Sequence, residues 1–340
     1  MPNKIKQVFP LGFPWETADP FLFCVYHEDF FPHGNNELGP DTPLTGRSIG
    51  NDFTIKDGWR MYHGDVVPGF PAHPHRGFET VTVVRRGVVD HADSLGAAGR
   101  NSSGDTQWLT AGKGVQHSEM FPLLREQQDN TLELFQIWLN LPASGKMVEP
   151  YFTMFWKEDT PVVESTDENG AGTRVDIIAG ALQDNMPPAP PPDSWAADQK
   201  NDVAIWVISM EAGAHWQLPA TSSGINRRLY YYKGQNLTIG DGLFTPGHGF
   251  VMAADTEATI VNGEQSSQLL LLQGKPIAEQ VAHYGPFVMN TRQELEQAFR
   301  DYQQTRFGGW PWPRADQVFP RDKGRFARYT DGHEEEKAFS

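Results

Sequence analysis

Two pairs of candidate metal ligands stand out in the sequence. His73 and His75 are separated by one residue, and so are His117 and Glu119. Side chains at positions i and i+2 of a β-strand point to the same face of the sheet, so each pair would present two ligands together. If the pairs lie on neighbouring strands of a barrel, all four side chains converge in its interior. Three neutral imidazoles and one carboxylate suit a borderline divalent metal ion.

The arrangement of these pairs favours a metal site over a structural use of the histidines. A His-x-His pair alone is often structural, but here a second pair accompanies it and no cysteine lies nearby. Four ligands leave positions open on a six-coordinate ion for water, a substrate or oxygen. A purely structural metal is the weaker alternative, because structural sites tend to be closed.

The other histidines have weaker claims as ligands. His91 lies in a strand-like run and has the parity of Asp93, so we expect a hydrogen-bonded structural residue. In the C-terminal half, His215 stands alone and His248 has no carboxylate two residues on. The second half of the chain is therefore expected to hold no metal.

Both halves of the chain carry short runs typical of β-strands, punctuated by Gly, Pro, Asn and Asp. Leu95–Gly104 is expected to be a flexible loop between two of them. This rhythm predicts two packed β-barrels of the jelly-roll type. The predicted strands are Arg60–Val67, Phe78–Arg85, Val88–Asp93, Asp105–Thr110, Leu132–Asn140, Thr173–Ile178, Val203–Ser209, Arg228–Tyr232, Gln235–Ile239, Glu257–Asn262 and Gln268–Leu272.

One helix is predicted near the C-terminus. Thr291 and Glu294 form a capping box, and apolar residues follow at helical spacing from Leu295 to Tyr302. The segment Trp310–Ser340 mixes aromatic and charged residues, which predicts an irregular tail pinned to a surface. We expect a first domain over residues 1–145, a second over 146–290, and the helix and tail over 291–340.

The composition excludes several classes of protein. The net charge of −15, from 43 acidic and 28 basic residues, argues against direct contact with nucleic acid. Pro10 and Pro14 interrupt the only early apolar stretch, so we expect neither a signal peptide nor a membrane span. The single cysteine, Cys24, allows no intrachain disulfide and fits a reducing compartment such as the cytoplasm.

Three long motifs resemble those of the pirin family, whose members are bicupins. His73–Thr82 (HPHRGFETVT) resembles the first cupin motif in its pirin form, and Gly104–Met120 resembles the second. Gly285–Arg292 is similar to the C-terminal signature of the family. The resemblance spans roughly residues 5 to 308, and the tail beyond is longer than the family pattern.

This resemblance implies an all-β fold of two tandem cupin β-barrels, with the C-terminal helix and the extended tail following. It implies metal in the first barrel alone, with His73, His75, His117 and Glu119 carried over as iron ligands. Fe(II) is the expected metal, and Mn, Co, Ni and Cu stay open because these ions share ligand types.

The resemblance also implies an activity, quercetin 2,3-dioxygenase, with a flavonol-like aromatic substrate and O2. Ring opening would release carbon monoxide. The alternative, also carried by the family, is a regulatory protein that is switched by its metal or its redox state. Such a protein would bind a transcription factor or a metabolic enzyme.

Glu79 competes with Glu119 for the role of the working carboxylate. In the wider cupin superfamily a Glu a few residues after the His pair binds the metal, and Glu79 shares the parity of His73 and His75. The pirin pattern favours Glu119 as the ligand and leaves Glu79 as a neighbouring catalytic candidate. The residues expected to line a substrate pocket, chosen because they flank the ligands, are Phe78, Trp108, Met120 and Phe121.

Overall fold

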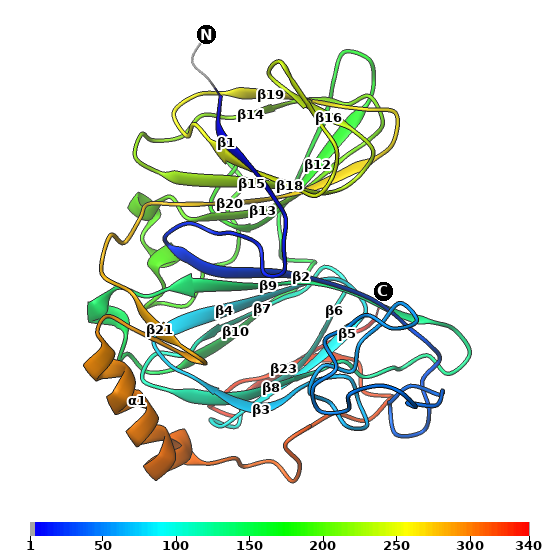
Figure 1. Ribbon diagram of the computed structural model, residues 1–340, viewed down its shortest axis with the longest axis vertical. Coiled ribbons are helices and arrows are strands. Elements are labelled where there is room, and N and C mark those ends of the chain that lie inside the picture. The colour runs from blue at the N-terminus through cyan, green and yellow to red at the C-terminus, as the bar shows by residue number, and fades with distance from the viewer. Residues whose placement is uncertain (1–3, 340) are drawn as a thin grey trace. The chain divides into compact units, whose positions relative to one another are not determined.

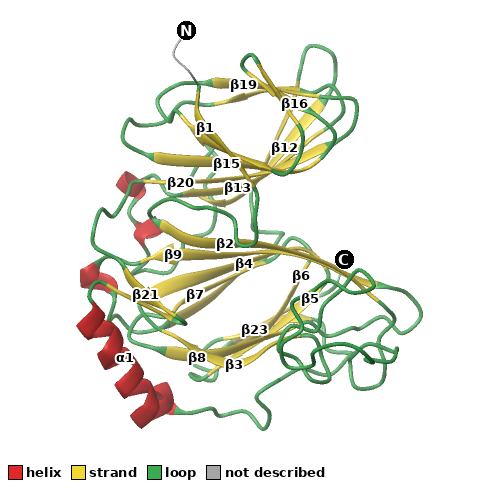
Figure 2. Ribbon diagram, in the orientation of Figure 1, coloured by secondary structure: helices red, strands yellow, loops and turns green. Residues whose placement is uncertain are grey.

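The structure, a computed structural model, describes residues 4–339. The chain forms two compact units, each of which combines separate stretches of sequence. The smaller unit comprises Met1–Val25 and Glu158–Ala278, and the larger unit comprises Tyr26–Lys157 and Glu279–Ser340. Strands dominate both units, which confirms the predicted all-β class (Figures 1 and 2).

The larger unit is built from two antiparallel sheets that form the two layers of a jelly roll (Figure 1). Their hydrogen bonding stays separate, so the described strands form a flattened sandwich instead of a closed barrel. One sheet has the order β10-β7-β4-β9-β2 and the other β24-β23-β6-β5-β8-β3. The strand bounds are β2 Phe21–Phe31, β3 Gly69–His75, β4 Phe78–Arg86, β5 Val88–Asp93, β6 Ala98–Ser102, β7 Thr106–Thr110, β8 Val115–Met120, β9 Asn130–Asn140, β10 Tyr151–Phe155, β23 Arg325–Arg328 and β24 Glu334–Lys337.

The smaller unit repeats the two-sheet plan, with the orders β1-β18-β15-β20-β13-β12-β11 and β14-β19-β16-β17. Large apolar side chains such as Trp206, Leu229 and Phe250 fill the space between its sheets. The strand bounds are β1 Ile5–Pro10, β11 Val162–Thr166, β12 Gly172–Ala179, β13 Ala204–Met210, β14 His215–Leu218, β15 Asn226–Lys233, β16 Leu237–Ile239, β17 Gly242–Phe244, β18 His248–Met252, β19 Ala258–Asn262 and β20 Ser267–Gly274.

Each end of the chain belongs to the unit that is built mainly from the other half of the sequence. Strand β1 pairs with β18, which assigns the N-terminal stretch to the smaller unit. The segment Glu279–Ser340 joins the larger unit. The borders between the compact units therefore differ from the domain borders expected at residues 145 and 290. Those domain borders remain a prediction from the sequence.

Helix α1, Arg292–Thr305, begins where the capping box predicted it. Thr291 Oγ1 accepts a hydrogen bond from the Glu294 amide at 3.2 Å, and the Glu294 carboxylate accepts one from the Thr291 amide at 2.8 Å. Its buried Leu295 and Ala298 pack with Phe287 on a small hairpin. This hairpin consists of β21 Ala282–Tyr284 and β22 Phe287–Met289. No helix in the described part of the chain is long and apolar enough to cross a membrane.

Two predictions about the larger unit are wrong, and a third is wrong in part. Arg60–Val67 is not a strand; it makes only isolated bridges, and Tyr62 adopts a positive φ of 58°. Leu95–Gly104 is not a flexible loop, because its centre is the buried strand β6. Strand β6 pairs with β5 on one side and with the tail strand β23 on the other. Contrary to the prediction, the tail is also not wholly irregular, because it contains strands β23 and β24, and β23 is the partner that makes this polar stretch a strand.

A buried ion pair fastens the tail to the larger unit. Arg100 donates to both carboxylate oxygens of Asp90, at 2.6 and 2.8 Å, and neither residue is exposed. The same guanidinium donates to the tail carbonyls of Phe319, Pro320 and Lys323 at 2.7–2.8 Å. The five donors of arginine therefore link the β5–β6 hairpin to the tail at one point.

We predict that Asp90→Asn weakens the larger unit by about 3–5 kcal/mol, because it leaves the buried Arg100 without a compensating charge. Hydrogen exchange of the β23 amides, measured by mass spectrometry, should become faster to match. The control is Glu296→Gln, which removes an exposed helix pair with Arg292 that is worth well under about 1 kcal/mol. If the β23 amides exchange as slowly in Asp90→Asn as in the wild type, the Asp90–Arg100 pair does not fasten the tail.

Candidate metal centre

The three predicted histidine ligands meet between neighbouring antiparallel strands. His73 and His75 lie on β3, His117 lies on β8, and His73 is directly opposite His117 in the ladder. Because His75 follows His73 by two residues, its side chain leaves the same face. One potential ligand nitrogen from each ring lies within 4.8 Å of the others. The strand register therefore brings three imidazoles to one point.

Hydrogen bonds fix how two of the rings are oriented. His73 Nδ1 lies 2.9 Å from the carbonyl oxygen of Pro71, and His75 Nδ1 lies 3.4 Å from that of Pro286. A carbonyl oxygen only accepts, so the proton of each neutral ring is on Nδ1. Each Nε2 then keeps its lone pair for a metal, as is usual for histidine ligands.

His117 supplies the observation that tests whether a metal fits. Its side chain is fully buried, and neither ring nitrogen has a hydrogen-bond partner among the described residues. A buried polar group without a partner costs about 1–3 kcal/mol. A divalent ion between the three rings would satisfy one of these nitrogens, so the donor set fits a metal.

Burial also keeps the imidazoles in the form that binds metals. It lowers the pKa of His73 to about 4, and holds the pKa values of His75 and His117 well below the usual 6.5. Neighbouring rings add to this effect, since a proton on one ring disfavours a proton on the next. The cluster is neutral near pH 7.

Glu119 lies beside the imidazole cluster. Its Oε2 is 3.8 Å from His117 Nε2, and its Oε1 accepts a hydrogen bond of 2.6 Å from Thr82 on β4. Burial raises the pKa of this carboxyl, although the Thr82 bond works in the opposite direction. Glu119 therefore lies next to His117, outside the three-histidine cluster, and can hold a proton more readily than an exposed glutamate.

Family comparisons agree with this geometry. The model of the Pirin family matches residues 15–139, and that of the Pirin C-terminal cupin domain matches residues 205–308. A pirin-like protein of Caulobacter vibrioides is 37% identical over 243 residues, 72% of this chain and 82% of its own length. This chain belongs to the pirin family.

Other relatives extend the comparison within the pirins. A pirin-like protein of Solanum lycopersicum is 35% identical and covers 71% of this chain and 77% of its own length. The crystal structure of quercetin 2,3-dioxygenase from Acinetobacter baumannii superposes with a TM-score of 0.68 at 25% identity. The match covers 90% of this chain and 98% of that protein. The two-cupin architecture of this pirin is thus shared along nearly its whole length.

Glu79 lies away from the histidines of this pirin. Its neighbours on β4, Phe78 and Thr82, contact His75 and Glu119 and so face the space between the sheets. Side chains alternate along a strand, which turns Glu79 to the opposite face, where its Oε1 accepts a 2.7 Å bond from Thr110. Its catalytic role remains a prediction, and the geometry favours Glu119.

Of the four residues expected to line a substrate pocket, some lie near the histidines and others face away from them. The Phe78 ring lies 5.0 Å from His75, and Phe121 packs on Phe70, whose ring is 6.3 Å from His73. Trp108 pairs with Val81 and shares the face of Glu79. Met120 follows Glu119 directly and packs away from it, with Leu38 and Val67. Phe78 therefore adjoins the centre, Phe121 lies one ring farther out, and Trp108 and Met120 face elsewhere.

Reasoning from motifs missed three residues beside the centre. The Trp138 ring lies 5.4 Å from His75, and Phe70 lies beside His73. His91 is opposite Glu119 in the ladder, and its ring is 5.4 Å from His117. The alternation of β9 and β5 could have placed Trp138 and His91 inward, but only with the correct partner strands.

We predict that His117→Ala lowers metal affinity by at least about tenfold, since removing even a partner of a ligand costs 10–100-fold. Elemental analysis of the purified protein should then find little metal, against about one ion per chain in the wild type. His215→Ala and His248→Ala serve as controls and should keep their metal. Normal metal content in His117→Ala would refute the site.

We also predict that acid destabilises the metal-free protein. Burial lowers the pKa of His27 to about 3 and of His73 to about 4, so the unfolded chain binds protons that the folded chain refuses. The contribution of these histidines to the free energy of unfolding is therefore fully present above about pH 6.5. It is lost as the pH falls to about 4 for His73 and to about 3 for His27. Each such histidine contributes a slope of up to about 1.4 kcal/mol per pH unit.

Urea unfolding of the metal-free protein at pH 7 and pH 5 measures this slope. His27→Gln should flatten it, whereas the control His215→Gln, at an exposed position, should not. Equal urea midpoints at the two pH values would contradict the prediction.

Proposed function

We propose that this pirin is a metal-dependent dioxygenase that opens the heterocyclic ring of a flavonol such as quercetin. The observation that carries this proposal is the convergence of three neutral imidazoles, two of them buried and one half-buried, beside a carboxylate. His73, His75 and His117, with Glu119 as the fourth ligand, would hold the ion. The name of the Acinetobacter baumannii structure supports the substrate class.

Iron(II) is the proposed ion, with Mn, Co, Ni and Cu compatible with the same donors. When bound, such an ion supplies Lewis acidity toward the hydroxyl and ketone oxygens of a flavonol, together with redox capacity for O2. The proposed setting is the cytoplasm, where Cys24, a buried free thiol, would remain reduced.

Glu119 is the residue proposed to accept the proton of the substrate hydroxyl. Burial raises its pKa, which brings the carboxyl closer to the pH at which it must exchange a proton. Thr82 holds one of its oxygens and leaves the other, Oε2, on the side of His117. The carboxylate is thus positioned before a substrate arrives.

Thr82 works together with Gln136 on β9. Thr82 Oγ1 lies 2.6 Å from Glu119 Oε1 and 2.8 Å from the side-chain oxygen of Gln136. One hydroxyl hydrogen cannot serve two acceptors. Either the Gln136 amide turns its NH2 toward Thr82 or Glu119 carries a proton, and both arrangements complete the network. The network can therefore accommodate both protonation states of Glu119.

Aromatic side chains give the centre an apolar wall. The Phe78 and Trp138 rings lie 4.3 Å apart, tilted by 37°, next to His75, and Phe70 flanks the half-buried His73. These rings would give a flat aromatic substrate apolar contacts near the histidines. Such walls also exclude water from the proton that Glu119 is to take.

We predict that Glu119→Gln lowers flavonol turnover by about 10²–10⁴-fold, because the amide cannot accept a proton. The thermal unfolding temperature should stay near that of the wild type, since the amide is nearly isosteric. The assay uses iron-loaded protein, a flavonol panel and O2, with metal-free protein as the blank. The matched control is Glu79→Gln, on the opposite face of β4, which should retain turnover.

Two results would decide against this proposal. Full turnover in Glu119→Gln together with its loss in Glu79→Gln would transfer the role of base to Glu79. Only trace cleavage by the fully metal-loaded wild type, with partner binding that differs between Fe(II) and Fe(III), would favour the regulatory alternative.

A further inference from the structure

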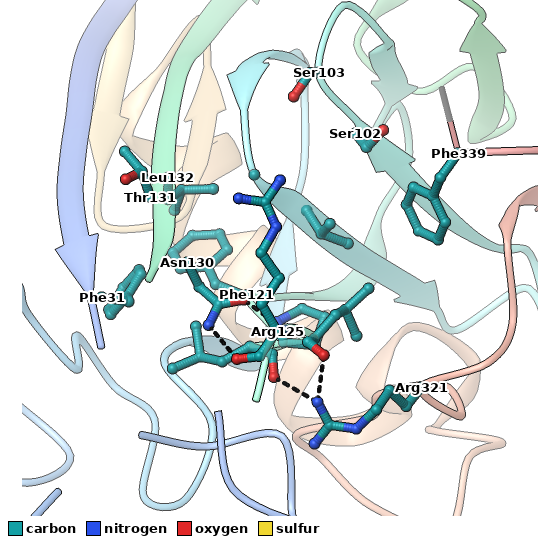
Figure 3. A pocket seen from close by; sticks show the side chains of 15 residues that line it. Phe31, Ser102, Ser103, Phe121, Arg125, Asn130, Thr131, Leu132, Arg321 and Phe339 are labelled. Atoms are coloured by element: carbon teal, nitrogen blue, oxygen red, sulfur yellow. Dashed lines mark hydrogen bonds between the residues drawn. The ribbon is translucent and has the colours of Figure 1, made fainter. Parts of the chain in front are cut away.

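A cavity in the larger unit is lined by none of the proposed metal ligands, although Phe121, one of the expected pocket residues, contributes to it (Figure 3). We call it the tail pocket; its characteristic residues are Phe31, Phe121, Arg125, Leu132, Arg321 and Phe339. Its volume is about 340 Å³, which is at the lower end of the range for small-molecule sites. Arg321 and Phe339 belong to the tail, beyond residue 308, where the family match ends.

The base of the tail pocket is apolar and rigid. Phe31, Phe121 and Leu132 are each at most 3% exposed and belong to one hydrophobic cluster of the larger unit. Phe339 lines the pocket from the tail, near Ser102, and is 44% exposed (Figure 3). These side chains offer contact to an aromatic or branched apolar body while leaving an opening to solvent.

Arg321 builds the pocket and does not serve a ligand. Its guanidinium donates to the carbonyl oxygens of Leu123, Leu124 and Asn35, at 3.1, 2.5 and 2.5 Å. It also forms an ion pair of 3.4 Å with Glu126. These bonds fix the segment before Arg125 and consume both the donors and the charge of Arg321.

Arg125, in contrast, presents a charge without a partner. Asn130 fixes its backbone, accepting from the Arg125 amide and donating to its carbonyl, both at 2.9 Å. The Arg125 guanidinium forms no hydrogen bond or ion pair within residues 4–339, and Figure 3 shows it extending through the pocket. Arg125 is an exposed residue with a fixed backbone, so its guanidinium is available to pair with an anion at the pocket.

The charge of the lining is opposite to that of the molecule. The chain has a net charge of −15, yet no aspartate or glutamate lines the tail pocket. The hydroxyl groups of Ser102 and Ser103 add further polar atoms to the lining. The lining would therefore attract a small anion even though the net charge of the protein is negative.

We propose that the tail pocket binds a small aromatic carboxylate. The carboxylate would pair with Arg125, whose planar guanidinium matches it in a bidentate fashion. The ring would lie on the apolar base formed by Phe31, Phe121 and Leu132. A single available guanidinium suits one negative charge better than the two of a phosphate. This site is separate from the metal centre and does not depend on the proposed function.

Calorimetric titration of the full, metal-loaded chain tests the proposal. The probes are benzoate, phenylacetate and 1-naphthoate, each paired with its uncharged amide. At least one acid should bind about tenfold or more tightly than its amide. Arg125→Met should remove that preference, and because its side chain bonds to no described residue, the variant should fold and keep its metal. Arg292→Met, at an exposed arginine of α1, is the matched control and should bind as the wild type does.

A further variant separates the two sites. His117→Ala should keep the carboxylate affinity, which excludes binding of the acid to the metal. The proposal is overturned if no acid is preferred over its amide, if Arg125→Met binds the acids as well as the wild type, or if His117→Ala abolishes binding.

Discussion

The direct pairing of His73 with His117 across β3 and β8 is the contact on which the candidate metal centre depends. It sets the ring centroids 4.5 Å apart, and the alternation of the strand then brings His75 to 4.8 Å from both. A slip of one residue would turn one member of the pair to the other face of the sheet. The ladder register is thus also the geometry of the site.

The surrounding protein maintains this register from several directions. The Pro286 carbonyl, which orients His75, comes from the hairpin that α1 covers. On the next strand, Gln116 donates to the carbonyls of Arg306 and Gly309, which tie the residue before His117 to the end of the helix. Segments nearly two hundred residues apart in sequence therefore position the same small cluster.

Patterns among residues close in sequence correctly predicted the features that depend only on such residues. The i, i+2 spacing of the ligand pairs and the capping box at Thr291 depend on neighbours in sequence, and both are realised. The fate of Leu95–Gly104 could not be predicted in this way, because its partner strand lies in the tail, more than two hundred residues away. Distant pairing, and not the residues themselves, makes this stretch a strand.

The position of Glu79 shows why the face of a residue cannot be predicted by counting alternation across a turn. Counting parity from His75 assumes one continuous strand, but β3 ends at His75 and β4 begins at Phe78. Gly77, with φ of 83°, makes the connection, and a Cβ there would lie 2.0 Å from the carbonyl oxygen of Val288. The turn resets the alternation, so that Phe78 faces the centre and Glu79 does not.

The tail also has a consequence for how separate molecules behave. Without β23, strand β6 would expose a row of unpaired amides and carbonyls, a template on which another chain could add a strand. With the tail in place, the outermost strand is β24, Glu334–Lys337, whose four side chains are all charged. At the other margin of the sheet, the Ala315 carbonyl occupies the Ala72 amide of β3. The tail thereby covers the β6 edge of the sheet that carries the histidines and occupies one amide of its β3 edge, which disfavours edge-to-edge pairing.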